Sequence, residues 1–226
     1  MIDRLALVAA EMAADRTVRA IVIRGRGRFF CTGGDIEAWG ALSPQDMGRD
    51  WIPRGIDAFN RIAALPQPVI AVISGHALGG GLELALTADL RIAQRRAKLG
   101  TPEVTLGMIS GWMGVRRLAE IIGVARARHM TLLGAPIPAE QALEWGLITA
   151  LAEDDAGLER QLDAWLDTLC ANAPTAMASI KGILATMHQD LGHHHASAVA
   201  EAAATEDCKE GVRAFLEKRK PVYRNR

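Results

Sequence analysis

Two glutamates stand out because each lies in an otherwise apolar segment. Glu83 is the only charge between His76 and Asp89, and its nearest neighbours are leucine and alanine. Glu103 follows the stiff Pro102 in a second, mostly apolar segment. A buried carboxyl group has a raised pKa and is either paired or functional. Two such groups can orient water and deliver a proton, which is general acid–base chemistry.

Each glutamate also has a structural interpretation. The apolar residues around Glu83 predict a buried helix, where its carboxyl group can be bonded to a backbone N–H or an arginine. Glu103 can be a glutamate in the first turn of a helix, beside the positive end of the helix dipole. The residues alone leave these alternatives open.

Two glycine-rich stretches add a second kind of chemistry. Gly79, Gly80 and Gly81 follow the apolar run PVIAVISG, and Gly33 and Gly34 follow RAIVIRG. Glycine lets the backbone approach a ligand, and a helix N-terminus presents unpaired N–H groups. Loops after two neighbouring parallel strands can aim two donors at one oxygen, forming an oxyanion hole. The alternative is a tight strand-to-helix turn, and neither a dinucleotide fingerprint nor a P-loop is present.

The elements that position these residues alternate between strands and helices. We expect strands at 19–25, 68–75 and 90–93, a loop with short helices at 39–55, and a helix at 56–65. Asp35 is placed to cap the helix that follows it. This order predicts an α/β fold with a largely parallel sheet over residues 1–135, followed by a helical region over residues 136–226.

The composition excludes several classes of function. The chain has 26 Lys and Arg against 26 Asp and Glu, so its net charge is zero. We therefore expect no nucleic-acid partner and no attraction to an anionic membrane. No apolar run approaches the roughly 20 residues that span a bilayer. The three scattered cysteines indicate reduced thiols and a cytoplasmic protein. The triplet His193–His195 has no companion ligand at metal-binding spacing, so we expect no metal.

Four segments resemble the crotonase (enoyl-CoA hydratase/isomerase) superfamily, in the right order along the chain. They are RAIVIRGRGRFFCTGGDI, PQPVIAVISGHALGGGLELALTADLRIA, LGTPEVTLGMISG and EGVRAFLEKRKPVY. The resemblance implies a crotonase-like spiral of ββα turns with a helical C-terminal trimerisation region. It also implies a homotrimer or a dimer of trimers. The strand pair that usually begins the family fold is missing from the sequence, so we expect an N-terminally short core.

The resemblance also assigns roles to particular residues. The backbone N–H groups of Gly34 and Gly80 correspond to an oxyanion hole for the thioester carbonyl of an acyl-CoA. Glu83 and Glu103 correspond to the catalytic glutamates of hydratases, with Glu83 assigned to the water and Glu103 to the α-proton. Gly111 corresponds to the glycine whose N–H positions the water. Coenzyme A is part of the substrate, and no separate cofactor is implied.

Other positions are expected near the CoA end or the acyl end of the substrate. Phe215 and Lys218 correspond to contacts with the CoA nucleotide, although Lys218 can instead complement a helix C-terminus. Trp112 and Met113 stand where hydratases commonly have small residues, so we expect them to border the acyl group. Trp112 can also pack outward at a subunit interface. Glu37 replaces a basic residue that many members carry near the CoA phosphates.

The sequence therefore predicts hydration of a 2-enoyl-CoA to a 3-hydroxyacyl-CoA. Paired glutamates favour this reaction, because isomerases and hydrolases of the family often keep only one carboxylate. An enoyl-CoA isomerase, a hydrolase of a CoA thioester or β-diketone, and a catalytically weak acyl-CoA binder are the alternatives.

Overall fold

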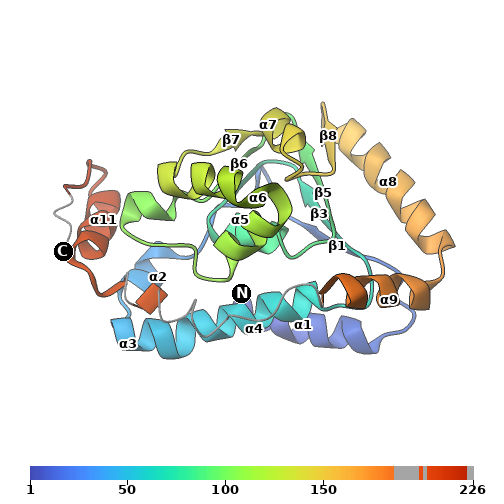
Figure 1. Cartoon of the computed structure of the whole chain (residues 1–226), viewed down its shortest axis with the longest axis horizontal. Coiled ribbons are helices and arrows are strands. Elements are labelled where there is room, and N and C mark those ends of the chain that lie inside the picture. Colours follow the sequence, from blue (N-terminus) through green and yellow to red (C-terminus); the bar gives the residue numbers. More distant parts are fainter. Residues whose placement is uncertain (186–198, 201–202, 223–226) are drawn as a thin grey trace.

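The computed structural model describes residues 1–185, 199–200 and 203–222, and its strands form two four-stranded sheets (Figure 1). The first sheet is wholly parallel and contains, in order, β1 (Ile21–Arg24), β3 (Val69–Ile73), β5 (Leu90–Gln94) and β8 (Ala150–Ala152). The second contains β2 (Phe29–Cys31), β4 (His76–Leu78), β6 (Lys98–Gly100) and the antiparallel β7 (Ile137–Pro138).

The first six strands alternate between the two sheets, so the chain winds as a spiral. Each of the first three strand pairs gives one strand to each sheet and is followed by helix. The helices that close these turns are α4 (Ile52–Ala63), α5 (Gly80–Ala85), and the 3₁₀ helix η2 (Pro102–Leu106) with α6 (Gly114–Leu133). This arrangement confirms the predicted α/β class and the spiral of ββα turns.

The central strand β3 explains why its sequence is continuously apolar. All five of its residues are buried. Val69, Ala71 and Ile73 belong to the main hydrophobic core, whereas Ile70 and Val72 belong to a smaller cluster that also contains residues of α8 (Asp155–Ala171). A parallel strand covered on both faces has no solvent side, so it shows no alternation of polar residues.

The segment after β2 is more helical than its sequence predicts. It contains α2 (Ile36–Gly40), α3 (Pro44–Asp46) and the π-helical turn η1 (Met47–Trp51), which leads directly into α4. The expected start of the long helix at residue 56 is therefore wrong. Pro53 is compatible with the first helical turn, because the N–H it lacks has no partner there. The predicted cap is confirmed, since the Asp35 side chain accepts the Ala38 N–H at 3.1 Å.

The sheets continue beyond residue 135, where we expected the helical region to begin, because β7 and β8 supply the last strand of each. The other described helices are α1 (Ile2–Ala14), α7 (Ala139–Glu144), α9 (Pro174–Ala185) and α11 (Glu206–Leu216). None of the described helices combines the length and apolar character needed to cross a membrane. The triplet His193–His195 lies outside the described residues.

Candidate active site

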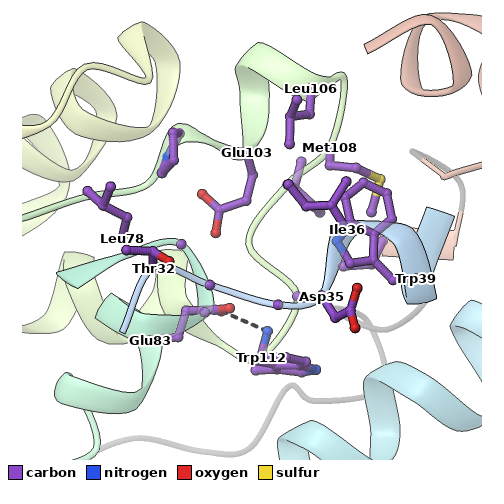
Figure 2. A pocket seen from close by; sticks show the side chains of 18 of the residues that line it. Thr32, Asp35, Ile36, Trp39, Leu78, Glu83, Glu103, Leu106, Met108 and Trp112 are labelled. Atoms are coloured by element: carbon purple, nitrogen blue, oxygen red, sulfur yellow. Dashed lines mark hydrogen bonds between the residues drawn. The ribbon is translucent and has the colours of Figure 1, made fainter. Parts of the chain in front are cut away.

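A pocket of about 570 Å³ lies where the glycine loops after β2 and β4 meet η2 and the start of α6 (Figure 2). Both predicted glutamates and both predicted oxyanion glycines line it. The remaining wall is largely apolar and includes Trp39, Trp51 and Trp112. The structure thus brings seven candidate residues to one cavity: Gly34, Gly80, Glu83, Glu103, Gly111, Trp112 and Phe215.

The two glycine loops converge because β2 and β4 are parallel neighbours and end at the same edge. A Cβ atom on Gly33 would lie 3.8 Å from the backbone nitrogen of Gly80. Gly79 has φ +54°, a conformation that glycine adopts freely. Within the described part of the chain, the N–H groups of Gly34 and Gly80 have no hydrogen-bond partner. Both donors are therefore available to an oxygen bound in the pocket.

Glu83 is buried in the first turn of α5, with 2% of its surface exposed. Its Oε1 accepts the N–H of Trp112 at 2.7 Å and that of Gly114 at 2.8 Å; Figure 2 draws the first bond. Burial and the negative charge of Glu103 raise the pKa of Glu83 to about 8, against the opposing effect of the two N–H donors and Arg117. A carboxyl group with this pKa can gain or lose a proton near neutral pH.

Glu103 projects from the first turn of η2 into the pocket (Figure 2). The hydroxyl of Ser110 donates to its Oε1 at 3.1 Å. Its Oε2 is buried and has no hydrogen-bond partner among the described residues. Burial raises the pKa of Glu103, although the Ser110 bond acts in the opposite direction. An unpartnered carboxyl oxygen beside the glycine loops is available to exchange a proton with a bound molecule.

The raised pKa of Glu83 predicts a stability that depends on pH. Between pH 4.5 and about 8 the folded protein keeps a proton on Glu83 that the unfolded chain has released. The unfolding free energy should therefore fall as pH rises through this window. Glu83→Gln does not titrate, so its stability relative to the native protein should increase from pH 5 to 8, by on the order of a few kcal/mol.

Thermal or urea unfolding across this pH range measures the effect. Glu144→Gln, which removes an exposed carboxylate at the end of α7, is the control for a glutamate substitution away from the site. A constant stability difference between Glu83→Gln and the native protein would contradict the raised pKa.

Trp112 is wedged between α4 and the start of α5. A Cβ atom on Gly55 would lie 2.1 Å from the indole Nε1, and one on Gly80 would lie 2.6 Å from Cζ3. The indole also packs against Phe59, with ring centroids 5.2 Å apart, and against Trp51 at 6.2 Å. Because Trp112 is buried in the chain's own core, the alternative that it packs outward is wrong.

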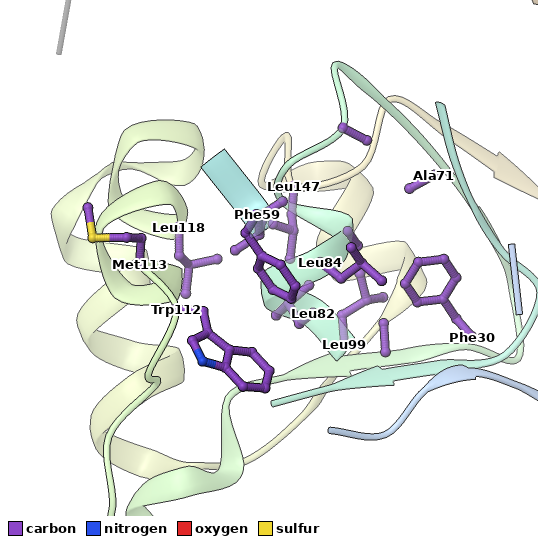
Figure 3. Packing of buried hydrophobic residues seen from close by; sticks show 14 of the residues in the cluster. Phe30, Phe59, Ala71, Leu82, Leu84, Leu99, Trp112, Met113, Leu118 and Leu147 are labelled. Atoms are coloured by element: carbon purple, nitrogen blue, oxygen red, sulfur yellow. The ribbon is translucent and has the colours of Figure 1, made fainter. Parts of the chain in front are cut away.

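Of the other predicted residues, Phe215 lines this cavity, whereas Met113 and Lys218 do not. Met113 is buried in the main core and does not line the pocket, and in Figure 3 its side chain points away from the Trp112 indole. We expected it beside the acyl group; its φ of +70° turns the chain and directs the side chain elsewhere. Phe215 lines the pocket although it is half exposed, whereas Lys218 is exposed and lies just after α11, outside the pocket lining.

Several residues around the site have no clear signal in the sequence. Ser110 is one small polar residue in an apolar loop, and only the fold brings it to Glu103. Arg117 donates to the carbonyl of Trp112 at 2.8 Å and to Oδ1 of Asn60 at 2.6 Å, a link between distant segments. Among the described residues, no group of three or more His, Cys, Asp or Glu side chains is placed to hold a metal ion.

Comparisons with known proteins agree with the family that the sequence motifs resemble. The family model for enoyl-CoA hydratase/isomerase matches residues 1–226. A Bacillus subtilis (strain 168) protein named "Probable enoyl-CoA hydratase" is 37% identical, over 99% of this chain and 88% of its own. The short-chain-enoyl-CoA hydratase of Clostridium acetobutylicum is 34% identical, over 94% and 83%. The crystal structure of carnitinyl-CoA hydratase from Mycobacterium avium superposes with a TM-score of 0.84 at 33% identity, covering 100% and 88%.

Proposed function

This chain is an enzyme of the enoyl-CoA hydratase/isomerase family, and from that premise we propose that it adds water to a 2-enoyl-CoA thioester. The product is a 3-hydroxyacyl-CoA. Coenzyme A enters as part of the substrate, and the reaction needs no further cofactor. The pair of buried carboxyl groups in one pocket, beside two available backbone donors, is the observation that carries this proposal.

The proposed reaction uses each of these groups once. The thioester oxygen accepts the N–H groups of Gly34 and Gly80, which makes the β-carbon electrophilic and stabilises the enolate. Ionised Glu83 takes a proton from water as the water oxygen bonds to the β-carbon, with the N–H of Gly111 orienting that water. Protonated Glu103 then delivers a proton to the α-carbon. One water molecule is added, and a proton passes from Glu83 to Glu103 to restore the starting state.

The electrostatics support a pair in which one carboxyl group is charged and the other is protonated. Both carboxyl groups have a raised pKa, and the charge of Glu103 is itself one cause of the shift at Glu83. Two such groups ionise in sequence, so one is charged while the other still carries its proton. Burial and the charge of Glu103 favour a proton on Glu83, so its charged form is the minor one below about pH 8. The two N–H donors and Arg117 stabilise that charged form, which is the form that acts as the base.

The test of this proposal is the absorbance of crotonyl-CoA, combined with identification of the product. Hydration predicts loss of the enoyl absorbance, formation of 3-hydroxybutyryl-CoA and no free thiol. Release of free coenzyme A would identify a hydrolase instead, and conversion of a 3-enoyl-CoA without hydration would identify an isomerase. Either result, or the absence of turnover, would overturn the proposal.

Trp112 is expected to limit the length of the acyl group. Its indole lies against the oxyanion glycine Gly80 and occupies space toward α4 that a long chain would need. The native enzyme should therefore prefer short, branched or cyclic acyl groups, and Trp112→Ala should extend its activity to longer straight chains. Straight-chain substrates from crotonyl-CoA to hexadecenoyl-CoA measure the profile. A profile that Trp112→Ala leaves unchanged, or a native preference for the longest chain, would contradict this expectation.

We also propose how the rest of the substrate and the assembly are arranged. Phe215 at the pocket and Lys218 just beyond α11 are suited to hold the nucleotide end of coenzyme A. A homotrimer, or a pair of trimers, would cover apolar side chains that the single chain leaves exposed. The α9 residues Ile180, Ile183 and Leu184, each more than half exposed, support this assembly.

A further inference from the structure

The backbone before α6 has an uncommon conformation at Met113. Its φ is +70° and its ψ is 14°, in the left-handed region that residues other than glycine rarely adopt. Met113 lies between Trp112 and Gly114, the two residues whose N–H groups donate to the same oxygen of Glu83. A left-handed residue within a turn is the conformation that lets nearby N–H groups converge on one anion.

The surroundings hold this turn in place from several sides. Arg117 donates to the Trp112 carbonyl, while the Trp112 indole is wedged against Gly55 of α4. A Cβ atom on Gly114 would lie 2.5 Å from Cγ of Glu83, so the turn fits closely around this side chain. Strained backbone persists where its surroundings determine it this fully, and it is common at functional sites.

We propose that Met113 is a positioning residue for Glu83, acting through its left-handed backbone and not through its side chain. In the turn at residues 112–114, backbone N–H groups hold one carboxyl oxygen of Glu83, and the carboxyl group stays oriented toward the pocket. This inference rests on the proposed function only for the consequence in catalysis. The geometric claim concerns Glu83 and its donors alone.

The side chain of Met113 contributes to core packing and does not reach the site. It is buried in the main core and does not line the pocket. The charged groups that act on Glu83 are Glu103 of η2 and Arg117 of α6, and Met113 carries no charge of its own. Its influence on Glu83 is therefore exerted through the direction of the backbone donors on either side of it.

Two substitutions separate backbone conformation from side-chain packing. Met113→Gly removes the side chain but adopts φ +70° freely, whereas Met113→Val keeps apolar bulk but disfavours this conformation because valine is β-branched. We expect Met113→Gly to keep the native pH profile of kcat/KM. We expect Met113→Val to lose N–H donors to the charged form of Glu83 and shift the acidic limb of the profile upward by about one pH unit.

A second measurement makes the test independent of turnover. The stability change caused by Glu83→Gln is measured against pH in the native, Met113→Gly and Met113→Val backgrounds. The Glu83 titration should move to higher pH only in the valine background. A larger change in Met113→Gly than in Met113→Val, or identical titrations in all three, would overturn the proposal. If the titrations shift as expected but the native protein and both Met113 variants show no hydratase activity, the proposed function is overturned and the Met113 proposal is not.

Discussion

Glu103→Gln is expected to lower kcat for enoyl-CoA hydration by about 10²- to 10⁴-fold while the protein stays folded. Glutamine preserves the size of the side chain and can still accept the Ser110 hydroxyl. It cannot, however, deliver a proton from the position of Oε2, which has no other partner among the described residues. The loss should therefore appear in kcat more than in binding of the acyl-CoA.

Glu83→Gln should cause a loss of similar size for the complementary reason. The amide oxygen can still accept the N–H groups of Trp112 and Gly114, but the side chain no longer removes a proton from water. Stopped-flow absorbance measures the effect on kcat, and direct binding of a substrate analogue measures the effect on acyl-CoA affinity. Glu144→Gln on α7 serves as the control. If either active-site variant retained nearly full activity, the role assigned to that glutamate would be wrong.

The second large effect concerns the oxyanion hole. Gly34→Val is expected to reduce kcat by about 10²- to 10³-fold, the effect of losing one oxyanion donor. A Cβ atom on Gly34 would lie 3.5 Å from Trp39 and 3.8 Å from Trp112, so the protein itself has room for it. The added methyl groups would instead occupy the space in which the thioester oxygen must approach the N–H donors.

Gly80→Val tests the other donor less directly. Its Cβ atom would meet the Trp112 indole at 2.6 Å, so this variant should lose stability as well as rate and acyl-CoA affinity. Gly182→Ala in α9, where a Cβ atom meets nothing within 4 Å, is the control for a glycine substitution away from the site. A native kcat for folded Gly34→Val, or for folded Gly80→Val, would exclude that donor from the oxyanion hole.

The sequence predicted the site residues that carry their own signal. Glu83 and Glu103 are charges in apolar segments, and the glycine pairs follow apolar strands, so local composition was enough to select them. The α/β class could be inferred because the strands are short buried runs separated by helices, whereas the spiral of ββα turns was implied only by the family resemblance. The sequence did not predict the contacts of Ser110 and Arg117. Ser110 meets Glu103, seven residues away, only through the shape of the loop between them, and Arg117 meets Asn60, which is 57 residues away.

The backbone conformations of Met113 and of the start of α4 also could not be predicted from the sequence. Methionine rarely adopts positive φ, so nothing in its type predicted the turn that places it in the core and out of the pocket. The segment at residues 39–55 has a weak periodicity, yet tertiary contacts organise it into consecutive short helices. In both cases the surrounding structure overrides the local preference.

The close fit between Gly55 and Trp112 restricts the order in which these positions can change during evolution. A side chain larger than glycine at position 55 collides with the indole, so it is tolerated only after Trp112 has become smaller. Once the indole is gone, alanine at position 55 would relieve the cost of a glycine inside α4, roughly 0.5–1 kcal/mol. That second step would also make the return to tryptophan unfavourable. A lineage that widens its pocket by these two steps would therefore not readily narrow it again, because tryptophan could return only after position 55 had reverted to glycine.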